Sequence, residues 1–168
     1  MKQDKNIHFQ VQITAKDLWI FSMYHSNKGY LGVFNVLFTA ASLWLLVTRW
    51  SQVSLAYRLL LMVCVLMFTV WQPMLLYMKA AKQAKNPAVR EPMDMTCSAQ
   101  GILIEQNGQS QQVTWEQIVR VEQVRGLLIL YMGRVHAYLI PERAAKGCRE
   151  ELTELIRENL PGERRKKI

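Results

Sequence analysis

Residues that commonly carry out chemistry are present in this chain, but none stands at the spacing of a catalytic motif. His8, His25 and His136 have no acid or nucleophile at such a spacing. The adjacent carboxylates of Glu150 and Glu151 are typical of charges at the start of a helix. The sequence also contains no glycine-rich phosphate loop. We therefore expect that the protein is not an enzyme and uses no cofactor.

The three cysteines, Cys64, Cys97 and Cys148, lie far apart. They form no CxxC motif, and no cysteine and histidine pair has the spacing of metal ligands. We expect them to be small buried hydrophobic residues, with no metal site.

One group of basic residues has the charge to bind an anionic membrane surface. The group follows the second long apolar run. Each cation near such a surface contributes roughly 1 kcal/mol to binding. The same positive charges can also serve only to set membrane topology. This basic collar consists of Lys79, Lys82, Lys85 and Arg90.

The formal net charge of +8 does not indicate a nucleic-acid partner. Most of the excess lies beside the apolar runs, whereas residues 91–163 hold seven Lys or Arg against eleven Asp or Glu, a net charge of −4. A domain with that charge repels a phosphate backbone. We expect no nucleic-acid binding.

Two runs, residues 29–48 and 59–78, contain no charged residue and are 20 residues long each. As helices rising about 1.5 Å per residue, they would each cover roughly 30 Å, the thickness of the hydrocarbon core of a bilayer. The remaining chain is too short to bury both runs as core helices. The first run is also too long, and too far from the start of the chain, for a cleaved signal peptide. The sequence therefore predicts an integral membrane protein with two spans.

The distribution of cations predicts the orientation. Lys28 precedes the first span and the basic collar follows the second, whereas residues 49–58 between the spans carry only Arg49 and Arg58. Cytoplasmic flanks collect Lys and Arg, so both termini are predicted to be cytoplasmic and residues 49–58 to be an external loop. Gln72 and Pro73 interrupt the second span, where proline removes a backbone hydrogen bond. Neither span contains an ionisable Asp, Glu, Lys, Arg or His, so an ion path is not expected.

Residues 1–28 precede the spans and read as a strand followed by a short helix. In "NIHFQVQIT", apolar and polar residues alternate from Ile7 to Ile13, as in a strand with one buried face. Thr14 and Asp17 have the spacing of a capping box, which predicts that a helix begins here. We expect this helix to lie at the membrane surface.

After a basic juxtamembrane linker, residues 79–90, the segment 91–160 reads as six short antiparallel strands and a helix. Asn107 and Gly108 predict a two-residue hairpin turn, and the helix in "CREELTELIREN" has one apolar stripe. Residues 161–168 read as a basic tail. About 70 residues make a small core, so we expect the N-terminal strand to join this sheet and complete it. The expected fold is a two-helix transmembrane hairpin with a small cytosolic α+β domain, an open barrel or sandwich closed by its last helix.

The order of these elements, with the strands "VTWEQIVRVEQ", "LLILYM" and "HAYLIPERA", resembles the YcxB-like family of bacterial membrane proteins. The resemblance covers nearly the whole chain and implies a C-terminal PH-like domain and a location in the bacterial inner membrane. Glu142, Ala144 and Ala145 replace the basic and aromatic residues that are typical of the family after the proline. The plain interpretation of the matching residues is structural, with Trp115 in the core and Pro141 ending a strand. The residues that carry the resemblance are Asp17, Trp115, Ile118, Pro141 and Arg143.

These observations predict a non-enzymatic, membrane-anchored binding or adaptor module, whose PH-like domain contacts a partner protein or anionic phospholipid headgroups. One alternative is an immunity protein that neutralises a membrane-targeting toxin by helix packing, for which Ala40, Ala41 and Ser42 offer a close approach. Another is an accessory subunit of a membrane complex, and the sequence is also compatible with a homo-oligomer.

Overall fold

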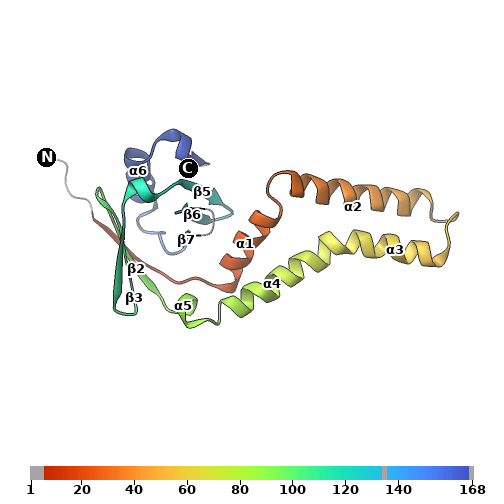
Figure 1. Cartoon of the computed structure of the whole chain (residues 1–168), viewed down its shortest axis with the longest axis horizontal. Coiled ribbons are helices and arrows are strands. Elements are labelled where there is room, and N and C mark those ends of the chain that lie inside the picture. The colour runs from red at the N-terminus through yellow and green to blue at the C-terminus, as the bar shows by residue number, and fades with distance from the viewer. Residues whose placement is uncertain (1–5, 134–135, 167–168) are drawn as a thin grey trace.

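The computed structural model describes residues 6–133 and 136–166. A long helical hairpin projects from one side of a β-rich body, as Figure 1 shows. The hairpin leaves the body through α2 (Tyr30–Thr48) and returns through α3 (Leu55–Leu66), a π-helical turn (Met67–Trp71) and α4 (Gln72–Gln83). Its two continuous helical arms, of 19 and 29 residues, are long and apolar enough to cross a membrane.

The side chains of the hairpin are mostly exposed. Only 6% of the most apolar stretch in each arm is buried, which excludes these helices as the core of the β-rich body. Among the described residues, every exposed large apolar side chain except Val119 lies between positions 30 and 78. The arms contact each other partly through aromatic rings, with Phe68 edge-on to Phe34 and Phe38. Among the described residues, the large exposed apolar side chains therefore lie almost entirely on the hairpin.

The predicted interruption at Gln72 and Pro73 takes the form of the π-helical turn. The backbone N–H of Gln72 donates to the carbonyl of Met67, five residues earlier. A π turn of this kind accommodates the missing N–H of Pro73 and often accompanies a change in helix direction. Figure 1 shows this change between α3 and α4.

The first sheet has the strand order β1-β2-β3-β4 and is antiparallel throughout. Its strands are β1 (Ile7–Val11), β2 (Met93–Ser98), β3 (Gly101–Gln106) and β4 (Gln109–Val113). Side chains of β1 alternate between buried and exposed, and Phe9 faces Met95 of β2. The predicted joining of the N-terminal strand to the sheet is thus confirmed. Asn107 and Gly108, with φ of 54° and 73°, form the predicted hairpin turn.

The second sheet has the order β7-β6-β5-β8. Its antiparallel strands are β5 (Arg120–Val124), β6 (Leu127–Tyr131) and β7 (Ala137–Pro141). The strand β8 (Arg165–Lys166) pairs in parallel with β5, so residues 162–166 pack on the body, although the sequence indicated only a tail. The guanidinium of Arg164 also donates weakly to the carbonyl oxygens of Glu116 and Ile118, at 3.5 and 3.4 Å.

The two sheets and the helix α6 (Arg149–Asn159) enclose one core. Leu152, Leu155 and Ile156 form the buried stripe of α6, as the sequence predicts. A short 3-10 helix, Trp115–Gln117, connects the sheets. The largest fully buried side chains include Met95 of the first sheet, Ile129 of the second and Ile156 of α6.

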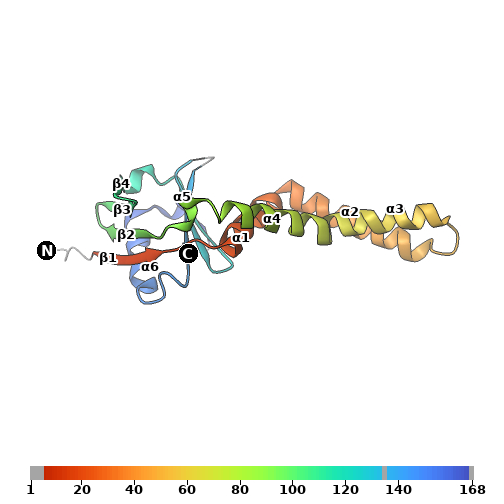
Figure 2. The same ribbon diagram turned by 90° about the horizontal axis from the view of Figure 1, so that it is seen from below.

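The helix α1 (Ala15–Ser26) follows β1, as the sequence predicts, and its position at a membrane surface stays a prediction. It packs along α4 on one side and contacts β5 and β6 on the other, and Figures 1 and 2 both place it beside α4. Trp19, Ile20 and Phe21 pack against the core, and the indole N–H of Trp19 donates to the carbonyl of Pro73 at 3.0 Å. The apolar side chains of α1 face in several directions. The helix therefore contacts both α4 of the hairpin and the strands of the body, and it joins the two parts.

Candidate functional site at the junction of hairpin and body

An ion pair holds the first turn of α1 to the body. Asp17 is 4% exposed, and its carboxylate accepts hydrogen bonds from the backbone N–H and the hydroxyl of Thr14 at 2.8 and 2.6 Å. Arg143, which follows β7, donates to the same carboxylate through both terminal nitrogens and also reaches the carbonyl of Gln12 at 3.0 Å. Burial alone would raise the pKa of Asp17, but the hydrogen bonds from Arg143 and Thr14 outweigh it and hold the pKa below 3.8.

A second carboxylate, Glu122 of β5, lies near the opposite end of α1. It is 1% exposed and accepts two hydrogen bonds from Nζ of Lys28, at 3.0 and 3.1 Å. The Tyr24 hydroxyl donates to it at 3.0 Å and the Tyr131 hydroxyl at 3.3 Å. Nε of Arg120 lies 3.0 Å from Oε1 as an ion pair, although its N–H does not point at the carboxylate. This group of residues is called the Glu122 cluster below.

The charges and hydrogen bonds of this cluster favour the ionised form of Glu122. Burial acts to raise its pKa, but hydrogen bonds from Lys28 and Tyr24 and the charges of Arg120 and Lys28 hold the pKa below 4.5. Lys28, which the sequence assigned to membrane flanking, is therefore engaged with a strand of the body.

A histidine and a tyrosine extend the Glu122 cluster. Nε2 of His25 lies 3.0 Å from the Tyr131 hydroxyl. Because that hydroxyl donates to Glu122, the His25 N–H is the donor in this contact. Burial and the charge of Glu122 raise the pKa of Tyr131 to about 12. Burial, followed by the charge of Lys28, lowers the pKa of His25. This shift disfavours the protonated imidazolium form of His25.

Both carboxylates are held by several hydrogen bonds and ion pairs. Asp17 holds the start of α1 to the corner after β7, and Glu122 holds Tyr24 and Lys28, at the end of α1 and just after it, to β5. Within the described parts of the chain, no three His, Cys, Asp or Glu side chains gather at a possible metal site. Cys64, Cys97 and Cys148 are free thiols. The arrangement is suited to positioning the body on the hairpin.

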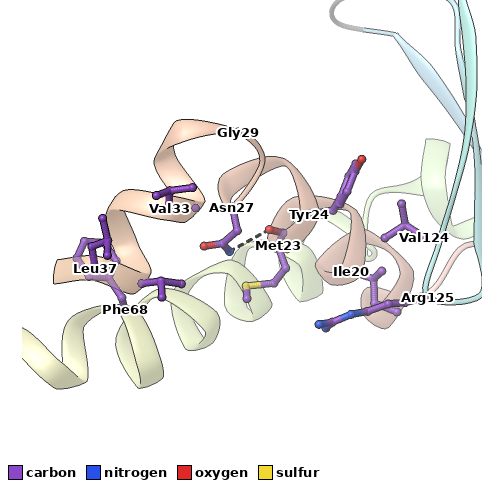
Figure 3. A pocket seen from close by; sticks show the side chains of 12 residues that line it. Ile20, Met23, Tyr24, Asn27, Gly29, Val33, Leu37, Phe68, Val124 and Arg125 are labelled. Carbon is purple, nitrogen blue, oxygen red and sulfur yellow. Dashed lines mark hydrogen bonds between the residues drawn. The ribbon is translucent and has the colours of Figure 1, made fainter. Parts of the chain in front are cut away.

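A cavity of about 680 Å³ opens beside this joint. Figure 3 shows its lining, with apolar side chains of α2 and the π-helical turn at one end and the β5–β6 turn at the other. Tyr24 and Asn27 lie between these ends, and Arg125 contributes the charge. The lining residues are Ile20, Met23, Tyr24, Asn27, Gly29, Gly32, Val33, Val36, Leu37, Phe68, Val124 and Arg125.

The basic collar lies at the base of the hairpin. Lys79 and Lys82 are on α4, Lys85 follows it, and Arg90 ends the short helix α5 (Pro87–Arg90). All four are exposed, and none forms an ion pair with another described residue. Ala80, between two of the lysines, is 1% exposed, so α4 buries one side and presents the lysines on another. The collar is therefore accessible to an anionic surface.

The other residues singled out from the sequence lie in the body. The Trp115 indole is 6% exposed and donates to the carbonyl of Ser98 at 3.0 Å. Ile118 is fully buried, and Pro141 is the last residue of β7. In α2, Ser42 is buried and donates to the carbonyl of Phe38, whereas Ala40 and Ala41 are exposed.

Sequence reasoning missed the Glu122 cluster and Arg125. Alternation along β5 was the available signal, because it puts Glu122 on the face opposite Val121, and both residues are buried. A charged residue on a buried strand face requires a partner. The partners Tyr24 and Lys28 lie 98 and 94 residues earlier, so no local pattern connects them to it.

The model of the YcxB-like protein family matches residues 97–156, from β2 into α6. The resemblance predicted from the sequence is confirmed over this segment, which contains Trp115, Ile118, Pro141 and Arg143. Asp17 and the hairpin lie outside it. No curated protein and no solved structure matches the chain.

Proposed function

We propose that this protein is a non-enzymatic, membrane-anchored binding module. In this proposal, α2 and the α3 to α4 arm cross the bacterial inner membrane. The body lies at its cytoplasmic face and contacts anionic lipid headgroups or a partner protein. The observation that carries the proposal is that nearly all large exposed apolar side chains of the described residues lie on the hairpin, because such a surface is stable in a lipid environment and not in water.

The arrangement of cations supports the orientation. The collar lies at the base of the hairpin, on the side of the body, whereas Arg49 and Arg58 lie at its tip. Arg49 donates to Gln52 at 2.8 Å, and Arg58 lies over the ring of Trp50 at 5.1 Å. The excess of positive charge at the base favours a cytoplasmic body.

The joint formed by α1 supports a role at the membrane surface. Ion pairs at Asp17 and Glu122 fix the body close to the base of the hairpin, so a bilayer around the hairpin would bring headgroups to the collar. Two mainly antiparallel sheets with a helix near the C-terminus also agree with the PH-like domain that the family resemblance implies. Four cations at roughly 1 kcal/mol each would hold the body against anionic lipid with about 4 kcal/mol.

Two measurements on the full chain test this proposal. Resistance to alkaline extraction from membranes tests insertion, and a chain released by alkali would contradict it. Proteolysis of residues 84–92 in reconstituted vesicles tests the collar. We expect protection in anionic vesicles, and loss of protection in Lys82→Gln/Lys85→Gln, because two charges contribute about 2 kcal/mol, or about 30-fold in the equilibrium.

The matched control is Lys146→Gln/Arg157→Gln, which removes two exposed cations from the α6 side of the body. Equal cleavage of the collar variant and this control in anionic vesicles would argue against headgroup binding. In that case, another protein that co-purifies with the full chain in a fixed ratio would favour the alternative, contact with a partner protein.

A further inference from the structure

We propose that the cavity between α1, α2 and the β5–β6 turn binds a single anionic membrane lipid. Its headgroup would lie at Arg125, and an acyl chain would lie along α2 and Phe68. This inference rests on the proposed membrane insertion, and it adds a specific lipid site to the general attraction of the collar.

The cavity has the size and the polarity of a site for an amphiphile. Its volume of about 680 Å³ is well within the range of about 300 to 1,000 Å³ that is typical of small-ligand sites. Val33, Val36 and Leu37 line the end of the cavity on α2, and all three are also exposed on the hairpin. The apolar end of the cavity is therefore continuous with the surface that would face lipid tails.

The backbone fixes this shape before any ligand binds. Gly29 has a φ of 70°, where a side chain would be strained, and a Cβ on Gly32 would lie 2.1 Å from the carbonyl oxygen of Asn27. Asn27 donates to the carbonyl of Met23 and accepts from the buried Asn35, both at 3.0 Å. The bend between α1 and α2 is thus held by close contacts, and the cavity is preorganised.

Arg125 gives the other end of the cavity its charge. Among the twelve lining residues it is the only charged one, and no acidic side chain lines the cavity. An anionic group is therefore favoured here.

The backbone of Arg125 is an independent observation. It occupies the first position of the two-residue β5–β6 turn, with a φ of 45°. Turns with this conformation favour asparagine or glycine, because a larger side chain is strained there. An arginine at this position conflicts with local preference, and such conflicts concentrate at functional sites. Both the charge and the strain thus point to the same residue.

These features favour a lipid over other occupants. A second copy of the chain would have to supply an apolar segment ending in a negative charge. Residues 30–78, which hold nearly all the exposed large apolar side chains, contain no Asp or Glu. A lipid supplies both parts, and the start of α2 at Tyr30 would place the cavity at headgroup depth in a membrane.

Native mass spectrometry of the full chain in mild detergent tests the site. After delipidation, the chain is titrated with phosphatidylglycerol and phosphatidylcholine of the same acyl chains. We expect one phosphatidylglycerol to bind about five- to tenfold more tightly than phosphatidylcholine, which corresponds to about 1 to 1.4 kcal/mol. In Arg125→Gly, phosphatidylglycerol should bind as weakly as phosphatidylcholine.

The glycine variant separates binding from folding, because glycine suits a φ of 45° and should not lower the melting temperature. Arg125→Lys should retain most of the preference for phosphatidylglycerol. Leu37→Trp should weaken both lipids by filling the apolar end. Arg157→Gln, a remote exposed site, should bind as the wild type does.

Equal affinity for the two lipids, or unchanged phosphatidylglycerol affinity in Arg125→Gly, would overturn the inference. So would an Arg125-dependent dimer that excludes lipid. If the chain resists alkaline extraction while any of these results is found, the lipid site alone fails. If the chain is extracted, the proposed membrane insertion fails as well.

Discussion

Replacing Glu122 by glutamine should loosen the joint between the hairpin and the body. The carboxylate is the only negative charge of the Glu122 cluster, and it faces two cations, Lys28 and Arg120. Glutamine has nearly the same shape and can still accept a hydrogen bond from Tyr24 or Tyr131. The substitution therefore removes the charge and leaves the packing of β5 almost unchanged.

The size of the effect follows from burial. Breaking a buried ion pair by removing one partner costs about 3–5 kcal/mol. The side chains of Lys28 and Arg120 are 34% and 31% exposed, so water can solvate part of their charge once Glu122 is neutral. We therefore expect a loss of about 2–3 kcal/mol in the free energy of unfolding. For a body of this size, that corresponds to a fall in melting temperature of about 10–20 °C.

Thermal unfolding of the full chain in detergent, followed by near-ultraviolet circular dichroism, measures this loss. Glu154→Gln is the matched control, because Glu154 is exposed on α6. Surface substitutions of this kind change stability by about 0.5 kcal/mol or less. Equal melting temperatures for Glu122→Gln and Glu154→Gln would refute the assignment of Glu122 as an ionised, paired carboxylate.

The same carboxylate predicts a pH dependence whose sign is fixed. The pKa of Glu122 is lower in the folded state than its ordinary value of 4.5, so near that pH the unfolded chain binds more protons. Its stabilising effect is fully present above pH 4.5 and is lost as the pH falls through the folded pKa. The gap in melting temperature between wild type and Glu122→Gln should therefore narrow below pH 4.5, and a gap that widens there would contradict the sign.

Two other residues give separate predictions. Asp17→Asn should cost about 1–3 kcal/mol, because Arg143 and Thr14 lose a charged acceptor. It should raise hydrogen exchange in the first turn of α1, and unchanged exchange there would argue against the ion pair. Cys97 is fully buried and burial raises its pKa to about 12, so a maleimide should modify it more slowly than Cys148 in the folded chain. Peptide mapping measures the order, and faster modification of Cys97 would contradict its burial.

Elements that depend on local signals could be predicted from the sequence. The alternation from Ile7 to Ile13 predicted β1, and Asn107 and Gly108 predicted the β3–β4 turn, because residue type sets face and backbone conformation directly. The two charge-free runs predicted the arms of the hairpin, because the length and composition of a run are also local signals. The joining of β1 to β2 also followed, since a small sheet with few core residues requires another strand.

Elements that depend on distant contacts could not be predicted. The strand β8 has two residues, too few for any periodicity, and it forms because it finds an open edge of β5. The packing of α1 between α4 and the second sheet was not predicted, because its apolar residues lie on several sides of the helix and its partners are distant in the sequence. Arg125 was missed because its strain becomes visible only once the β5–β6 turn is defined.

The position of α1 explains why two ion pairs are needed at the junction. A helix of 12 residues is about 18 Å long, and a single attachment at one end would leave the body free to pivot about that point. Asp17 and the Glu122 cluster instead attach opposite ends of the same segment to the second sheet, through the corner after β7 and through β5. The contacts of α1 with α4 then transmit this orientation to the hairpin. Because Tyr24 of the Glu122 cluster also lines the cavity, we expect loss of the Glu122 carboxylate to alter the proposed lipid site as well.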